Sequence, residues 1–325
     1  MDVAHIVERT KAREHRVLAG KIDKRKLSFP KRRSCWPFGS ERGTSATGGN
    51  QSLGFGNRPR PAGGSRRLMR LDRAVLRLPV EVQRDWAELL GPTEPALPFN
   101  PAAVVDLPAP ARRWLTHAIE PGTPLRQRVE LRQHGEIRVG AWRRFEALQA
   151  LAPLDGYIWA VTAHLFGLPI HGYDRFTHGT GDMHHRLLGR IPIVSSSGLD
   201  HTMSAAGRLA VESIWVPAVG LSSAVRWVAV DDTDVILRVP YEGRSHDVTL
   251  KVIPSGALEK VTMQRWASVD KGPFQYHPFG AEFHDEGTFG GYTVPTRTTA
   301  GYGYGTNRWP ASAFIRQAID QVVYH

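Results

Sequence analysis

Six histidines in one stretch of the chain are the first residues whose types and spacing could do chemistry. They are His164, His171, His178, His184, His185 and His201. On strands, Asp182 and His184 would share a face, and the seven-residue spacing of the first three histidines could bring them together. A metal site needs three ligands that converge on one point. Since the chain has no His-Glu-x-x-His sequence, we expect histidines that decorate surface strands and no metal site.

Glu212 is the most unusual carboxylate, because it lies among apolar residues in a segment that predicts a helix over 200–215. A charge placed there must be paired or must have a raised pKa. We favour a structural ion pair with Arg208, four residues earlier on the same helix. If Glu212 instead faces a cavity unpaired, it becomes the best general acid or base, with Asp182 and His184 as companions. That alternative indicates a hydrolase or an isomerase.

Other catalytic patterns are missing from the sequence. It has no Gly-x-Ser-x-Gly motif, and residues 195–198 predict a loop into the helix with Asp200 as N-cap. The single cysteine, Cys35, rules out a thiolate cluster. The glycine and tyrosine run 301–305 lacks the spacing of a dinucleotide-binding loop. We interpret this run as a loop whose tyrosines pack on a sheet edge, or alternatively as a lid over a cavity. We therefore assign no catalytic residue and no cofactor.

The positive charge belongs to one end of the chain. Of the net +11, residues 1–70 carry 17 Lys and Arg against 5 Asp and Glu, whereas residues 71–325 carry 25 against 26. The first segment is rich in Gly, Ser and Pro and predicts a disordered basic tail. It could be an arm for nucleic acid or anionic membranes, a targeting peptide, or the product of a start assigned too far upstream of Met69. We favour the third interpretation, and expect nucleic-acid binding only through residues 1–70.

The overall composition excludes several classes of protein. With 41% hydrophobic residues and one cysteine, the chain is no disulfide scaffold, collagen or coiled coil. It has no run of 18 or more uncharged apolar residues, and its N-terminus lacks the apolar stretch of a signal peptide. We expect a cytoplasmic protein without a transmembrane segment. The sequence leaves the oligomeric state open.

Two periodicities divide residues 71–325, which we predict to form a single domain. Residues 71–122 read as a helical segment, with a helical pair over 71–90 interrupted by Pro79 and a further helix opened by Pro108 and Pro110. From Leu125 onward the apolar period changes to two, which is typical of strands. Residues 129–139 predict a hairpin that turns at 134–136. The other predicted strands are 142–151, 156–166, 169–178, 182–194, 225–230, 234–240, 246–253, 258–266, 274–285, 292–298 and 315–323.

The short connections between these strands permit only antiparallel neighbours. A sheet of this many strands is not expected to stay flat, and curling around the apolar helix 200–215 is the natural solution. The predicted fold class is therefore α+β: a strongly curved antiparallel sheet wrapped around a central helix and preceded by an N-terminal helical segment.

Five spaced motifs carry a resemblance to a known family. They are LPAPARRWL at 107–115, PGTPL at 121–125, GAWRRFEALQ at 140–149, GDMHHRLLG at 181–189 and ESIWVP at 212–217. Together they resemble an uncharacterised bacterial domain-of-unknown-function family, over residues 107–325. The layout of that family is similar to the lipoprotein-carrier half-barrels, curved sheets whose apolar concave face accommodates acyl chains. The resemblance implies a half-barrel.

Aromatic residues concentrate in the predicted sheet. One helix does not fill the concave face of a half-barrel, so apolar volume is left for a ligand. We predict ligand-binding roles for Trp142, Trp159, Met183, Trp215, Trp227 and Phe283. The leading function is non-enzymatic binding of a lipid, an acyl chain or another hydrophobic small molecule in this cavity.

Overall fold

The computed structural model describes residues 75, 77–92, 95–165, 167–241 and 243–325. The predicted basic tail over 1–70 lies outside these residues, as does most of the first helix of the pair predicted before Pro79. Among the described residues, no helix combines the length and the apolar character needed to cross a membrane.

In the described part of the chain, thirteen strands form one antiparallel sheet. The strands are β1 (Val129–Val139), β2 (Ala141–Ala152), β3 (Gly156–Leu165), β4 (Leu168–Thr177), β5 (Thr180–Leu187), β6 (Ile191–Ser197), β7 (Arg226–Ala229), β8 (Asp234–Tyr241), β9 (Arg244–Val252), β10 (Leu258–Ser268), β11 (Phe274–Phe289), β12 (Tyr292–Tyr302) and β13 (Ala313–Tyr324). Their order is β6-β5-β4-β3-β2-β1-β13-β12-β11-β10-β9-β8-β7, so two meanders join where β1 pairs with β13.

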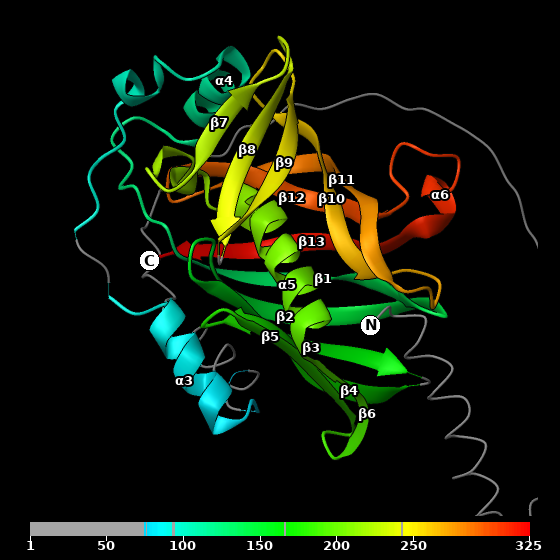
Figure 1. Ribbon diagram of the computed structural model, residues 1–325. Helices are drawn as coiled ribbons and strands as arrows, with labels where there is room; N and C mark the ends of the chain where they lie inside the picture. The colour runs from blue at the N-terminus through cyan, green and yellow to red at the C-terminus, as the bar shows by residue number, and fades with distance from the viewer. Residues whose placement is uncertain (1–74, 76, 93–94, 166, 242) are drawn as a thin grey trace, which may run out of the picture.

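Helices lie on both sides of this sheet. They are α3 (Val80–Leu89), α4 (Ala109–Ala118), α5 (Leu199–Val211) and α6 (Trp309–Ser312), with 3-10 turns η1 (Pro101–Val104), η2 (Glu212–Trp215) and η3 (Pro217–Leu221). The chain between the two meanders forms α5, which crosses the concave side and contacts β4, β5 and β6 on one arm and β9 and β10 on the other (Figure 1). The predicted fold class, a curved antiparallel half-barrel around a central helix, is confirmed.

Both faces of the sheet are buried where it carries helices. On β3, Tyr157, Trp159 and Val161 point to the concave side and join the main core, while Ile158 and Ala160 point to the convex side. The convex residues pack against Val82, Trp86 and Leu89 of α3. Because side chains alternate along a strand, neighbouring residues of β2 to β5 contribute to two different environments.

The hairpin predicted at 134–136 is wrong, and β1 is one continuous strand. It pairs with β13 on one side and with β2 on the other along its length. A Cβ atom on Gly135 would lie 2.1 Å from the carbonyl oxygen of Arg316. This glycine therefore allows β13 to approach closely, and the chain turns at Gly140 instead. The single strand predicted over 182–194 is in fact two strands, β5 and β6.

The predicted loop at Ser195–Ser197 is also wrong, because these residues belong to β6 and pair with β5. The N-cap of α5 is Gly198, not Asp200. Asp200 lies in the first turn and accepts a hydrogen bond from Nε1 of Trp266 at 3.0 Å. The predicted helix 200–215 is α-helical to Val211 and continues as the 3-10 turn η2.

Candidate functional site

A cavity of about 240 Å³ lies between α5 and the concave face of the sheet. Strands from both arms and the junction of the sheet form its walls, and apolar side chains such as Val161, Ala281 and Ile315 dominate the lining. Small alanines on neighbouring strands, Ala281 and Ala300, leave space beneath the helix that larger residues would fill. The cavity has the mostly apolar walls with a few polar groups that are typical of small-molecule sites.

Four of the six predicted ligand residues line this cavity. They are Trp159, Met183, Trp215 and Phe283. The other two lie elsewhere. Trp142 packs under the guanidinium of Arg316, whose Cζ is 4.4 Å from the ring centroid. Trp227 donates a hydrogen bond to the carbonyl of Gly220 and contacts the ring of Trp114. Aromatic content identified the sheet as a whole, but it did not identify the face to which each tryptophan points.

A chain of buried polar side chains connects two residues of the cavity lining, Trp159 and Glu212. Nε1 of Trp159 donates to Oε1 of Gln133 at 3.1 Å, and Nε2 of Gln133 donates to Oε1 of Gln149 at 3.0 Å. Nε2 of Gln149 then donates to Oε2 of Glu212 at 2.5 Å. Buried polar groups are costly unless such bonds satisfy them. The two glutamines therefore fix the position of the Glu212 carboxylate rather than leave it free.

Arg208 on α5 joins two buried carboxylates. Its Nε donates to Oε1 of Glu212 and its Nη1 to Oδ2 of Asp174 on β4, both at 2.7 Å. The predicted ion pair between Arg208 and Glu212 is thus present. Although burial alone would lower the pKa of Arg208, the charges of Glu212 and Asp174 raise it above its usual range. Burial likewise opposes ionisation of Asp174, but His201 and Arg208 hold the pKa of this carboxyl below its usual range.

The structure does not bring Glu212 together with Asp182 and His184. Asp182 and His184 are neighbours on the convex face, with His184 Nε2 3.2 Å from Asp182 Oδ2. Glu212 lies on the concave side of the same sheet. The alternation of β5 explains this separation, because Met183 and His185 point into the cavity and their neighbours point away from it. The predicted three-residue grouping is therefore not formed.

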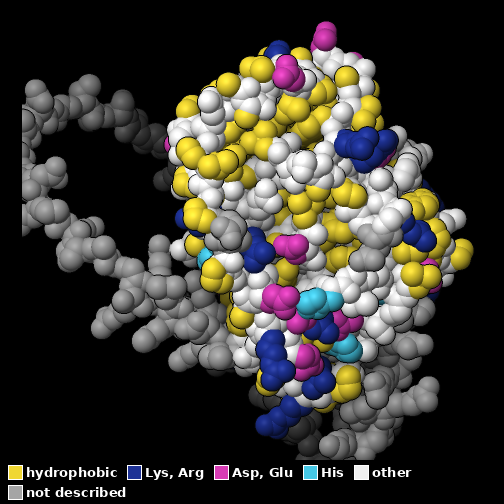
Figure 2. All heavy atoms as spheres, turned by 60° about the vertical axis from the view of Figure 1, so that its left-hand side comes forward, with side chains coloured by type: hydrophobic (Ala, Val, Ile, Leu, Met, Phe, Trp, Pro, Cys, Tyr) yellow, Lys and Arg dark blue, Asp and Glu magenta, His cyan; other side chains and the backbone are white. Residues whose placement is uncertain are grey.

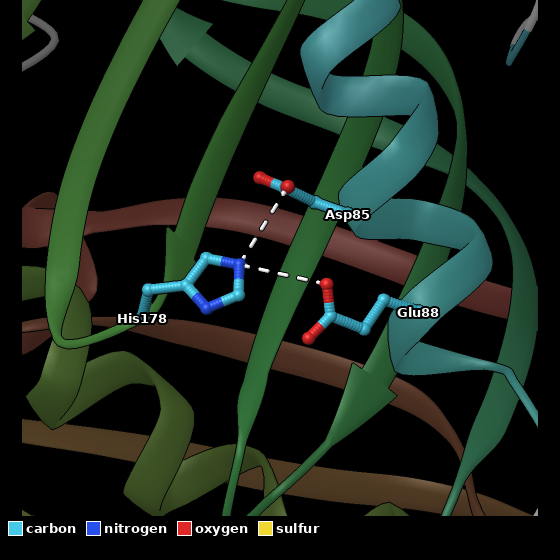
Figure 3. A group of neighbouring side chains, drawn as sticks. All are labelled: Asp85, Glu88 and His178. Atoms are coloured by element: carbon cyan, nitrogen blue, oxygen red, sulfur yellow. Dashed lines mark ion pairs between the residues drawn. The ribbon is translucent and has the colours of Figure 1, made fainter.

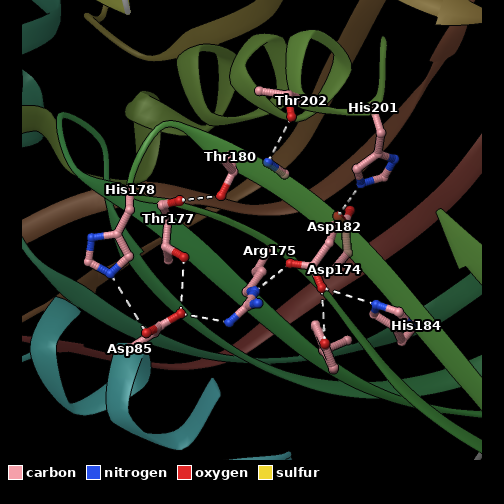
Figure 4. Close-up of polar contacts among 12 residues, drawn as sticks. Asp85, Asp174, Arg175, Thr177, His178, Thr180, Asp182, His184, His201 and Thr202 are labelled. Carbon is pink, nitrogen blue, oxygen red and sulfur yellow. Dashed lines mark hydrogen bonds and ion pairs between the residues drawn. The ribbon is translucent and has the colours of Figure 1, made fainter. Parts of the chain in front are cut away.

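The convex-face cluster instead connects α3 to the sheet. Arg175 on β4 donates through Nε to Asp182 and through Nη1 to Asp85 on α3, the latter at 2.7 Å (Figure 4). Thr177 donates to the same Asp85 oxygen at 3.0 Å, and the hydroxyl of Tyr173 donates to Asp182 at 3.0 Å. Burial, followed by the negative charge of Asp182, raises the pKa of Tyr173 above its usual range. These contacts fix α3 on the outside of the half-barrel.

His184 lies between a carboxylate and a hydroxyl. Its Nδ1 is 3.1 Å from Oγ of Ser195, and its Nε2 faces Asp182. These residue types occur in hydrolase triads, where the carboxylate orients the histidine. Here Asp182 already accepts hydrogen bonds from Arg175 and Tyr173. The arrangement is the product of cross-strand neighbours on β5 and β6, and the geometry supports a surface hydrogen-bond network.

One histidine of the predicted series approaches two acidic residues. In the described part of the chain, Asp85, Glu88 and His178 form the one group of three metal-ligating side chains whose ligand atoms lie within 4.8 Å of one another (Figure 3). Nε2 of His178 is 3.7 Å from both carboxylates. Asp85 is already bound by Arg175 and Thr177, so the group acts as a further contact between α3 and the β4–β5 turn.

Two other histidines lie on the cavity side. His185 lines the cavity, and burial lowers its pKa to about 4, so the ring is uncharged at neutral pH. His201, in the first turns of α5, has its Nε2 3.5 Å from Oδ1 of Asp174. The sequence spacing of the histidines therefore does not correspond to one shared site.

A second hollow of about 770 Å³ lies on the convex face beside the start of α3. Its lining mixes charges, including Arg77, Glu81, His171 and Arg186. In Figure 2, acidic, basic and histidine side chains gather in the lower half of the face that includes α3, whereas hydrophobic side chains predominate above them. The convex hollow is larger, but its walls mix charged and apolar side chains, whereas those of the concave cavity are mainly apolar. The concave cavity is therefore the better candidate site for an apolar ligand.

Sequence reasoning missed three residues that shape the concave cavity: Asp174, Arg265 and Tyr302. Arg265 shares one face of β10 with the buried residues Val261 and Met263. A charged residue in this alternating pattern indicates a cation that points toward the core. Tyr302 was assigned to a loop over 301–305, but it belongs to β12. No local signal marks Asp174, because its partner Arg208 is 34 residues away in the chain.

Comparison with known proteins places the chain in a family without an assigned activity. Residues 98–314 match a family of unknown function, DUF6544, and the chain belongs to it. The expected resemblance to a family of this kind is confirmed. A search of curated proteins finds no match.

Two solved structures have a similar course of the chain. A putative outer membrane lipoprotein-sorting protein domain from Vibrio parahaemolyticus is 9% identical, with a TM-score of 0.35 over 61% of this chain and 85% of that one. A LolA superfamily protein from Nitrosomonas europaea is 12% identical, with a TM-score of 0.37 over 66% of this chain and 92% of that one.

Proposed function

We propose that this protein binds a hydrophobic small molecule or an acyl chain in the concave cavity, with Trp159, Met183, Trp215 and Phe283 in contact with the ligand. The observation that carries the proposal is the cavity of about 240 Å³ with mainly apolar walls. Protein interiors are otherwise packed as densely as organic crystals. An apolar cavity of about 150 Å³ in another protein stays dry and takes up benzene. The concave cavity is larger and opens to the surface, so an apolar ligand could enter it and be buried against its apolar walls.

The energetics of such binding need no reactive group. Each methylene buried from water contributes about 0.8 kcal/mol, so a chain that inserts several methylenes gains enough to offset the cost of immobilisation. Three ionised groups of the cavity lining satisfy one another: Glu212 is held by Arg208 and Gln149, and Asp174 by Arg208. The network thus supplies a rigid wall, and binding without a chemical step is the function that the geometry supports best.

Displacement of a neutral dye from the full chain tests the proposal. We expect Nile red to fluoresce with the protein purified without detergent, and 1-decanol to displace it. Replacing Ala300, which lines the cavity, by Phe should weaken decanol binding about tenfold or more, because the ring occupies the ligand's space. The matched control is Ala229→Phe on the exposed surface of β7, which should leave binding unchanged. Equal effects of the two variants, or no binding of either decanol or an alkyl acid of the same length to the unaltered protein, would contradict the proposal.

A further inference from the structure

The positively charged guanidinium of Arg265 forms part of the wall of the concave cavity. Its Cζ lies 5.1 Å from the centroid of the Phe279 ring and 5.8 Å from that of Tyr302, both of which line the cavity. Helix α5 crosses directly over the Arg265 side chain at Gly207. A Cβ atom at that position would be 3.3 Å from Cγ of Arg265, which is closer than most such contacts. The absence of a side chain at Gly207 therefore makes room for the arginine beneath the helix.

The hydrogen bonds of Arg265 leave most of its donors available. Nε and Nη2 both point to the carbonyl oxygen of Ser204, at the long distances of 3.4 and 3.3 Å. A guanidinium carries five N–H donors in a planar fork. Among the described residues, Arg265 forms no ion pair with a carboxylate, although Asp174 and Glu212 line the same cavity.

A second arginine in the same cavity provides the contrast. Arg208 is bound by two carboxylates at 2.7 Å each, so its charge is compensated within the protein. His185, which also lines the cavity, is uncharged at neutral pH. Arg265 is thus a cation of the cavity lining that has no carboxylate partner among the described residues, so its charge is available to a ligand. Stacking on aromatic rings leaves the edge of a guanidinium free to bind a planar acid group with two parallel hydrogen bonds.

We propose that the ligand of the concave cavity is a single-chain amphiphile whose acid group binds Arg265 while its alkyl chain fills the apolar space; this inference rests on the proposed function. The volume of about 240 Å³ lies below the range of about 300–1,000 Å³ typical of sites for drug-sized ligands. It suits one chain rather than the two chains of a membrane phospholipid. The acid group can be a carboxylate, as in a fatty acid, or a phosphate, as in an alkyl phosphate, because the arginine fork matches both.

Ligands with one alkyl chain and different headgroups test this inference. Decanoate, decyl phosphate and 1-decanol are titrated against the full chain at pH 7.5, with displacement of Nile red as the readout. We expect the unaltered protein to bind at least one of the two acids about tenfold or more tightly than decanol, since hydrogen bonds to a charged group are strong. Whichever acid binds more tightly identifies the headgroup chemistry. In Arg265→Gln, the ratio of acid affinity to decanol affinity should fall to within about twofold of one, whatever the change in decanol binding itself.

Controls separate the charge from the fold and from the proposed function. Arg265→Lys keeps the charge without the planar fork and should retain only part of the preference. Arg226→Gln removes an exposed arginine of β7 and should retain all of it. Equal binding of acid and alcohol by the unaltered protein would overturn the inference and leave the proposed function intact. A preference that survives in Arg265→Gln would also overturn it. If decanol and both acids fail to bind the unaltered protein, the proposed function itself is wrong.

Discussion

The two faces of the sheet carry the same electrostatic arrangement in two different surroundings. Asp174 and Arg175 are adjacent on β4 and point to opposite faces. On the concave side, Asp174 and Glu212 hold Arg208 of α5, and on the convex side Asp182 and Asp85 hold Arg175. In each case one arginine joins two carboxylates and connects a helix to the sheet. A single strand therefore anchors both helices through consecutive residues.

The surroundings of the two clusters differ more than their exposure does. In the inner cluster, formed by Asp174, Arg208 and Glu212, the side chains are 11–15% exposed. In the outer cluster, formed by Asp85, Arg175 and Asp182, they are 16–20% exposed. The guanidinium of Arg208, however, lies 4.6 Å from the ring centroid of Tyr157 and 5.0 Å from that of Trp159, within the main core. Arg175 instead pairs with Asp85 of α3 and lies over the ring of Tyr173, a residue that lines the surface hollow. Water can replace a lost partner on the outside, whereas on the inside the alternative is an apolar cavity, so the same contact should differ in its energetic effect.

Removal of Arg208 is expected to have the largest effect. In Arg208→Ala, Asp174 and Glu212 would remain buried without their cation, which should lower the free energy of unfolding by about 3–5 kcal/mol. Urea denaturation followed by tryptophan fluorescence measures this change. Neutralising the acids as well, with Asp174→Asn and Glu212→Gln in an Arg208→Met background, should recover much of the loss. The exposed Arg226→Ala is the matched control, expected to change stability by less than about 0.5 kcal/mol. A loss for Arg208→Ala no larger than this would contradict the comparison.

Acid titration should destabilise the protein in part through a histidine of the inner face, His185. The ordinary pKa of histidine is about 6.5, and burial lowers that of His185 to about 4. Between these values the unfolded chain takes up a proton that the folded protein does not, so the free energy of unfolding falls as the pH is lowered through this window. We expect His185 to contribute about 1–3 kcal/mol to the loss. The loss that arises from Asp174 belongs to lower pH, because its pKa is held below the usual range of about 3.9 for an aspartate.

A variant isolates the contribution of His185 to this pH dependence. In His185→Gln, urea denaturation at several pH values should show a shallower slope between about pH 6.5 and 4. Part of the slope should remain, because burial also lowers the pKa of His171, His246 and His325. The matched control is His284→Gln, an exposed histidine of β11 that does not line the cavity. Identical profiles for the unaltered protein and His185→Gln would show that the concave face does not respond to pH in this way.

The sequence predicts contacts within one element better than contacts between elements. The four-residue spacing of Arg208 and Glu212 on a helix was sufficient to predict their ion pair, and the two-residue spacing of Asp182 and His184 placed them on one face. Periodicity also revealed most strands and the central helix. These predictions succeed because the geometry of a helix or a strand alone determines which side chains are neighbours.

The predictions that failed depend on residues distant in the chain. The turn expected at 134–136 is absent because Gly135 accommodates β13, which lies more than 170 residues later. The concave cluster needs α5 to pack on β4 so that Arg208 reaches Asp174. A period of two predicts that Asp182 and Met183 on β5 point to opposite faces, but it does not show which face of a curved sheet is concave, and so on which side Asp182 lies relative to Glu212. The packing of α5 determines that side, and it separates the two carboxylates.

The outer ion pair should give the smallest effect. A double-mutant cycle with Arg175→Ala and Asp85→Ala should yield a coupling free energy of about 1 kcal/mol, because both side chains lie near water and Arg175 keeps Asp182 as a second partner. Burial of Val82, Trp86 and Leu89 supplies most of the attachment of α3. A coupling free energy as large as that between Arg208 and Asp174, measured in the same way, would mean that water screens the two ion pairs to the same extent. The expected energetic difference between the two clusters would then not exist, and the comparison would be wrong.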